Sequence, residues 1–120
     1  VGCVVRDGDQ FAAALSTGGI NDAIPGRVGD VPLIGCGLYA GPDGAVAATG
    51  DGEYIAMQMT AFRAYQLIEQ GVDPKEIVAT AISWFKKPIS FGIIVVSKTG
   101  FAGGSNDSMA WTASEIEISL

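Results

Sequence analysis

Histidine is absent from the 120 residues, which excludes Ser–His–Asp, Cys–His and histidine–metal arrangements within this chain. Cysteine is scarce as well, because Cys3 and Cys36 stand alone among apolar and glycine residues. Two thiols are too few ligands for a metal site. We interpret them as small core residues in a reducing compartment, with a single disulfide as the alternative.

Positive charge is also in short supply, with 7 Lys and Arg against 13 Asp and Glu and a net charge of −6. This balance argues against a nucleic-acid partner and against an anionic membrane surface. No apolar run approaches the roughly 20 residues of a membrane-spanning helix, and the longest, residues 89–97, has the length of a buried strand. No basic and apolar leader is visible, so we expect a cytoplasmic protein.

Apolar residues, in contrast, are abundant: they make up 48% of the chain, and the mean hydropathy is +0.35. Residues 1–120 are enough for a single domain. The apolar excess predicts a surface that is buried against a missing half. The first residue is Val1 rather than methionine, and we expect it to follow a cleavage or truncation site.

Short apolar runs separated by turn residues predict strands over residues 1–6, 10–16, 33–40 and 45–49. Residues 7–9 and 41–44 are tight turns, and residues 21–32 form a polar loop. The strand at 45–49 consists of very small residues, which allow another layer to approach closely. The strands at 1–6 and 10–16, joined by the tight turn at 7–9, are expected to form a β-hairpin at the start of the chain.

A helical stripe follows residues 50–52, formed by Ile55, Met59, Phe62, Tyr65, Leu67 and Ile68 and ended by Gly71. Asp73, Pro74 and Glu76 begin a second helix, which Pro88 ends. Residues 91–97 and 101–105 are expected to form a hairpin, and residues 109–113 and 116–120 short final strands. This order predicts an α+β fold, with a mainly antiparallel sheet and helices on one face.

Two glycine-rich segments are candidate binding sites. Residues 50–53 (Gly-Asp-Gly-Glu) lie between a strand and a helix, but they lack the third glycine of a dinucleotide fingerprint. Backbone N–H groups at Thr49 and Gly50 suit an oxyanion, with a plain tight turn as the alternative. In residues 26–30, Arg27 suits an α-carboxylate and Asp30 an α-ammonium, with a local surface ion pair as the alternative.

A third candidate is the hydroxyl of Thr17, which follows a strand and precedes two glycines. There it would lie close to a substrate, although simple turn chemistry explains the same residues.

Taken in this order, the segments 14–19 (Ala-Leu-Ser-Thr-Gly-Gly), 25–30 (Pro-Gly-Arg-Val-Gly-Asp), 34–40 and 48–53 resemble the β-subunit of N-terminal-nucleophile asparaginases. The resemblance covers nearly the whole chain. Residues 94–100 and 108–111, with Pro25 before Gly-Arg-Val-Gly-Asp, are closer to the isoaspartyl peptidase/plant-type branch than to the glycosylasparaginases.

The resemblance implies a precursor that cleaves itself to expose an N-terminal threonine, here expected immediately before Val1. Its hydroxyl attacks the side-chain carbonyl of L-asparagine or of a β-aspartyl peptide, and its own α-amino group is the base. The implied roles are an oxyanion hole for Thr49 and Gly50 and a hydrogen bond to the nucleophile for Thr17. Arg27 would bind the α-carboxylate, and Asp30 with the Gly52 carbonyl the α-ammonium.

The resemblance also implies that the chain forms half of a four-layer αββα sandwich completed by an α-subunit, and that two such heterodimers associate. It implies no cofactor and no metal ligand in this chain. Two alternatives stay open: a glycosylasparaginase that acts on glycan-linked asparagine, and a non-catalytic homologue.

Overall fold

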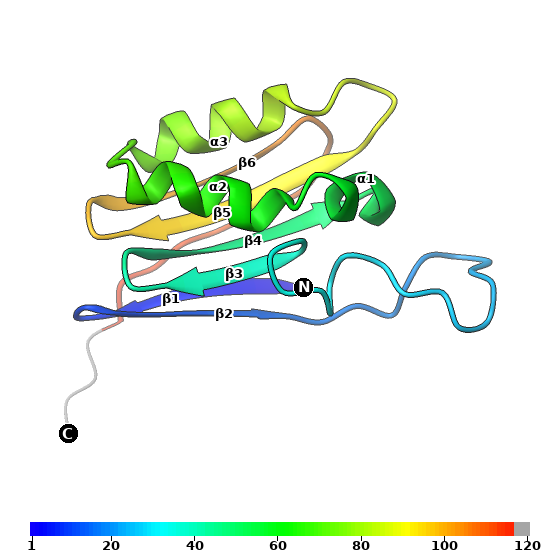
Figure 1. Ribbon diagram of the computed structural model, residues 1–120, viewed down its shortest axis with the longest axis horizontal. Helices are drawn as coiled ribbons and strands as arrows, with labels where there is room; N and C mark the ends of the chain where they lie inside the picture. Colours follow the sequence, from blue (N-terminus) through cyan, green and yellow to red (C-terminus); the bar gives the residue numbers. More distant parts are fainter. Residues whose placement is uncertain (117–120) are drawn as a thin grey trace.

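The computed structural model describes residues 1–116, which form three layers (Figure 1). The elements in chain order are β1 (Gly2–Asp7), β2 (Gln10–Leu15), β3 (Leu38–Gly41), β4 (Gly44–Gly50), α1 (Gly52–Met57), α2 (Thr60–Glu69), α3 (Pro74–Ser83), β5 (Phe91–Ser97) and β6 (Gly100–Ser105). Strands β3 to β6 form one antiparallel sheet in the order β3-β4-β5-β6, and β1 and β2 form a separate hairpin. The predicted α+β class is confirmed.

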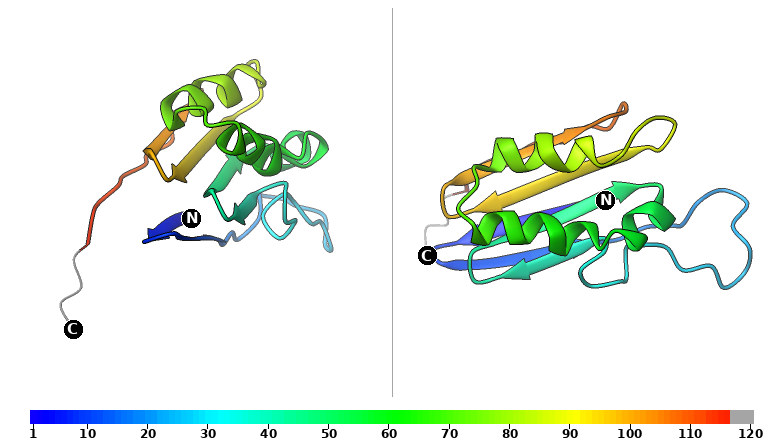
Figure 2. Two further views of the ribbon diagram at one scale, coloured as in Figure 1. Left: turned by 60° about the vertical axis from the view of Figure 1, so that its left-hand side comes forward. Right: turned by 45° about the horizontal axis from the view of Figure 1, so that its top comes forward.

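The helices cover one face of the four-stranded sheet, and the hairpin lies against the other (Figure 2). Alternate residues of a strand point to opposite faces, so Val46 and Ala48 of β4 meet the helices together with alternate residues of β5. The helices contribute apolar faces of the expected period: Ala61, Ala64, Tyr65 and Ile68 from α2, and Ile77, Val78 and Ala81 from α3. The main core therefore lies between the sheet and the helices.

Helix α3 begins where the sequence predicts. The Asp73 side chain accepts a hydrogen bond from the Lys75 N–H at 2.9 Å, and Pro74 occupies the first helical position. This satisfies one of the otherwise unpaired amides of the first turn.

The second sheet face belongs to the hairpin, which packs against β3, β4 and β5. Ala45 and Ala47 of β4 are buried on this face, and their small side chains let the hairpin backbone come close. Gly2 shows how close, because a Cβ added there would lie 2.5 Å from the Leu15 side chain and 3.5 Å from the Ala47 Cβ. The predicted approach of another layer to this strand is confirmed.

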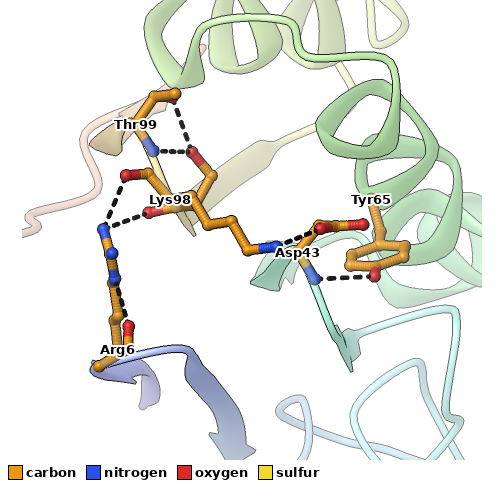
Figure 3. Close-up of polar contacts among 7 residues, drawn as sticks. Arg6, Asp43, Tyr65, Lys98 and Thr99 are labelled. Carbon is orange, nitrogen blue, oxygen red and sulfur yellow. Dashed lines mark hydrogen bonds and ion pairs between the residues drawn. The ribbon is translucent and has the colours of Figure 1, made fainter.

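The turns at one end of the sandwich are tied together by polar contacts (Figure 3). The Arg6 guanidinium donates to the Lys98 carbonyl at 2.7 Å, and the Lys98 ammonium pairs with the Asp43 carboxylate at 2.8 Å. The Asp43 N–H donates to the Tyr65 hydroxyl of α2 at 3.2 Å. These contacts connect the hairpin, the main sheet and a helix at the end opposite the β2–β3 loop.

One predicted helix is in fact two, because α1 ends at Met57 and α2 begins at Thr60. Met59 adopts a left-handed conformation with φ of 50°, which interrupts a continuous helix. The first amides of α2 bind carbonyls of a distant loop instead: Ala61 N–H donates to Cys36 and Phe62 N–H to Gly35. The prediction of one helix was wrong because these partners lie far away in the sequence.

The predicted strand at residues 33–40 is only partly present, since β3 begins at Leu38. Residues 33–37 form consecutive turns in which Cys36 N–H donates to Leu33 and Gly37 N–H to Asp30. Gly35 has φ of 93°, a conformation that glycine adopts without strain. Leu33 and Ile34 are therefore exposed rather than inside a sheet.

Residues 109–113 were predicted as a strand but form none, because this segment has no regular secondary structure. Met109 and Trp111 lie where Cβ atoms on Gly92 and Gly103 would be. The last predicted strand, residues 116–120, falls mostly outside the described residues. Among residues 1–116 no helix is long and apolar enough to cross a membrane. Both cysteines are free, and Cys3 is exposed rather than in the core.

The outward face of the hairpin is apolar. The cross-strand pairs Cys3–Ala14 and Val5–Ala12 share this face, and all four residues are exposed. A strand pair that is apolar on both faces is expected to be covered by a further layer.

We therefore expect residues 1–120, expressed alone, to lack a cooperative thermal transition and to bind a dye that recognises exposed apolar surface. Differential scanning calorimetry of this chain, compared with the full-length protein, checks this. A sharp, reversible transition from the isolated chain would contradict the expectation.

Candidate active site

One end of the sandwich contains a cavity of about 370 Å³. It lies where β2 and β4 end and where the loop between β2 and β3 folds back, at the right of Figure 1. The polar and glycine residues that line it include Thr17, Arg27, Asp30, Thr49 and Gly50. Five residues predicted for one site, from positions 17 to 50 of the sequence, are therefore brought together.

The loop that carries Arg27 and Asp30 is fixed to the main sheet. The Asp30 carbonyl accepts from the amides of Leu33 and Gly37, each at 3.1 Å, and the Ala48 N–H of β4 donates to the Gly37 carbonyl at 2.7 Å. A side chain at Gly37 would lie 2.6 Å from the Asp30 carbonyl oxygen and 3.0 Å from its Oδ2. The lack of a side chain there lets Asp30 lie directly against the turn.

Arg27 binds Glu53 rather than Asp30. Its Nε and Nη2 donate to the Glu53 Oε1 at 2.9 and 2.7 Å, and these bonds lower the pKa of the Glu53 carboxyl. The alternative of a local Arg27–Asp30 ion pair is therefore wrong. Because a guanidinium has five N–H donors, other donors of Arg27 remain for an anionic ligand.

Asp30 is buried, with 5% of its surface exposed. Its Oδ2 has no hydrogen-bond partner, and among the described residues it is the one buried side-chain oxygen or nitrogen in this state. Burial raises the pKa of the Asp30 carboxyl, while its own backbone N–H and the nearby Arg27 oppose the rise. A buried carboxylate oxygen without a partner is costly, so the position of Oδ2 suits a cationic ligand group.

Gly52, at the start of α1, lies against both charged residues. A Cβ added there would be 2.6 Å from the Asp30 Oδ1 and 3.3 Å from the Arg27 Nη2. The predicted group of Arg27, Asp30 and Gly52 is thus contiguous, with Gly52 at the edge of the cavity rather than in its lining.

Thr49 and Gly50 end β4 at the cavity. Thr49 is on the same strand face as Ala45 and Ala47, the face that meets the hairpin, and it is exposed. Gly50 has φ of 135°, and a Cβ there would collide with the Ser90 carbonyl. Glycine is required at this strand end for both reasons.

The hairpin brings Thr17 to the same place. Val1 and Ser16 exchange two backbone hydrogen bonds of 2.7 and 2.9 Å, next to the Gly2–Leu15 pair. Val1, Ser16 and Thr17 all line the cavity. The Thr17 hydroxyl accepts from the Gly19 N–H at 3.0 Å, which leaves its own proton free to donate.

Sequence reasoning gave no role to two groups of the site. Glu53 was visible in the Gly-Asp-Gly-Glu motif, but its pairing with Arg27 spans 26 positions and has no local signal. The same holds for the contact of Asp51 with Ser90. Within residues 1–116 no three His, Cys, Asp or Glu side chains are close enough together to hold a metal ion.

The fold and the site define an α+β chain that presents one cationic and one anionic group in a cavity at the end of a sheet. A protein-family profile described as asparaginase matches residues 1–117, and the chain belongs to this family. It is 41% identical over 121 residues to the human isoaspartyl peptidase/L-asparaginase and 40% identical to that of Macaca fascicularis, covering 96% of this chain in both cases. It is also 42% identical over 105 residues, 83% of this chain, to a plant-type L-asparaginase of Pyrobaculum calidifontis.

The chain spans 39% of the length of the human and macaque relatives and 35% of the Pyrobaculum protein. The similarity therefore concerns a part of each of these proteins.

We expect Asp30→Asn to stabilise the ligand-free full-length protein at neutral pH by about 1 kcal/mol or more, because it removes a buried negative charge whose Oδ2 has no hydrogen-bond partner. The pKa of Asp30 is raised above its ordinary value of 3.8, so the folded state binds a proton at this carboxyl more tightly than the unfolded state does. Its contribution to stability is thus greatest in acid and declines as the pH rises from 3.8 through the folded-state pKa. Denaturant unfolding of wild type and Asp30→Asn between pH 3.5 and 8, values chosen to bracket this window, measures the difference. If the free energy of unfolding depends on pH in the same way in both proteins, burial does not destabilise the Asp30 carboxylate.

Proposed function

We propose that this chain is the β-subunit of a threonine-type amidohydrolase that releases L-aspartate from β-aspartyl dipeptides and from L-asparagine. The observation that carries the proposal is the arrangement of charges in the cavity. Arg27 is held by Glu53 and has donors to spare, while Asp30 is buried with an oxygen that has no partner. A ligand with a carboxylate and an ammonium group on one carbon matches both.

The proposed chemistry begins at a threonine immediately before Val1. Its α-amino group takes the proton of its hydroxyl, and the oxygen attacks the side-chain amide carbon of the substrate. Thr49 and Gly50 at the end of β4 stabilise the oxyanion, and Thr17 donates a hydrogen bond to the nucleophile.

The protonated α-amino group gives its proton to the leaving nitrogen, so collapse of the tetrahedral intermediate expels ammonia or an amine and leaves a β-aspartyl ester on the threonine. Water, activated by the same amino group, then releases L-aspartate and restores the hydroxyl. Arg27 holds the α-carboxylate throughout, and Asp30 with the Gly52 carbonyl holds the α-ammonium.

The remaining part of the enzyme is proposed to be an α-subunit from the same precursor, with two heterodimers associated. The apolar outward face of the hairpin and the 39% coverage of the human and macaque relatives support a second half that completes the αββα sandwich.

The direct test is to express the full-length precursor, allow it to mature, and assay aspartate release from a β-aspartyl dipeptide, L-asparagine and glycan-linked asparagine. We expect release from the first two and a new N-terminal threonine just ahead of Val1. Release from the glycosylated substrate alone would favour a glycosylasparaginase. A folded protein without cleavage or release would indicate a non-catalytic homologue.

We expect Arg27→Ala to raise KM for L-asparagine by about 10- to 100-fold, the loss expected for charge-assisted hydrogen bonds. Its KM for 3-aminopropanamide, which lacks the α-carboxylate, should change little. Glu53→Ala is the matched control, because it keeps the guanidinium but removes its anchor and should have a smaller effect. If Arg27→Ala weakens both substrates equally, Arg27 does not bind the carboxylate.

A further inference from the structure

Asp51 lies between the two proposed oxyanion-hole residues and helix α1, and its side chain binds a neighbouring strand end instead of the helix. It occupies the N-cap position of α1, where an aspartate normally accepts a bond from a first-turn amide. Here it makes no such bond. Its Oδ2 accepts from the Ser90 N–H at 2.8 Å instead.

The contact between Asp51 and Ser90 is reciprocal. The Asp51 N–H donates to the Ser90 carbonyl at 2.9 Å, so two hydrogen bonds join the residue after β4 to the residue before β5. The Ser90 carbonyl is also the atom that a side chain at Gly50 would strike. The pair therefore holds the two strand ends together directly beside Gly50.

Ser90 is itself held from the other side. Its hydroxyl donates to the Asp107 carboxylate at 2.9 Å. The Asn106 side chain accepts from the Phe91 N–H and donates to the Ile89 carbonyl, both at 2.9 Å. Asp51 is thus bound to a segment that the end of β6 already fixes.

We propose that Asp51 is a positioning residue for the reaction, holding Thr49 and Gly50 in place through Ser90 so that these two residues meet the developing oxyanion. The inference rests on the proposed function. Gly50 has φ of 135°, and glycine can adopt many other backbone conformations. The Asp51–Ser90 pair restricts Gly50 to this one. Oxyanion stabilisation depends on donors that are fixed before the reaction, so the pair acts on the transition state rather than on substrate binding.

The test uses the mature full-length enzyme with Asp51→Ala, Asp51→Asn and the control Asp73→Ala. Asp51→Ala should lower kcat for L-asparagine about tenfold or more and change KM by less than about twofold. Asp51→Asn keeps an oxygen that accepts from Ser90 and should retain most of the activity. Asp73→Ala removes the N-cap bond of α3 and should lower Tm without lowering kcat.

Amide hydrogen exchange supplies a readout that does not depend on activity. Exchange in residues 49–51 should be faster in Asp51→Ala, close to wild type in Asp51→Asn, and unchanged in Asp73→Ala. Unchanged kcat or unchanged exchange in Asp51→Ala would overturn the proposal, as would an equal loss of kcat in Asp73→Ala. If the wild type releases no aspartate, the proposed function fails, and exchange alone decides whether Asp51 fixes this segment.

Discussion

The site depends on how closely the β1–β2 hairpin lies against β4. Ala45 and Ala47 present little more than backbone to the hairpin, and Gly2 fits where any side chain would collide with Leu15. Close packing of this kind leaves little room for adjustment. It sets where the start of β1 and the end of β2 emerge, and hence where Val1 and Thr17 lie relative to Thr49 and Gly50. The contacts of Arg6 at the opposite end secure the same arrangement.

The β2–β3 loop carries the charged residues Arg27 and Asp30 into the cavity. The loop is attached to β4 through Gly37 and Ala48, which buries Asp30 while Arg27 reaches Glu53 of α1. A buried carboxylate with one unpaired oxygen lowers the stability of the free protein, and such costs are typical of binding sites. The arrangement is intelligible if a ligand supplies the missing cation.

Local rules predicted the elements whose causes are local. The hairpins at residues 7–10 and 97–100 have short turns between apolar runs, and α3 has its cap and proline in the expected places. The break at Met59 and the turns at residues 33–37 were not predictable, because amides of α2 and carbonyls of that loop satisfy one another across the fold. Thr17, Arg27, Asp30, Thr49, Gly50 and Gly52 were predicted from motif order and resemblance, and the structure brings the first five to one cavity. The partners Glu53 and Ser90 are set by tertiary structure and carry no motif.

The most direct test of the proposed threonine mechanism is to trap the acyl-enzyme. The mature full-length enzyme is mixed with a β-aspartyl dipeptide, quenched in acid within the first turnover, digested, and analysed by mass spectrometry. The proposed mechanism predicts a β-aspartyl ester on a threonine in the peptide that begins immediately before Val1. An aspartyl adduct on another residue, or aspartate release with no adduct at any time point, would contradict it.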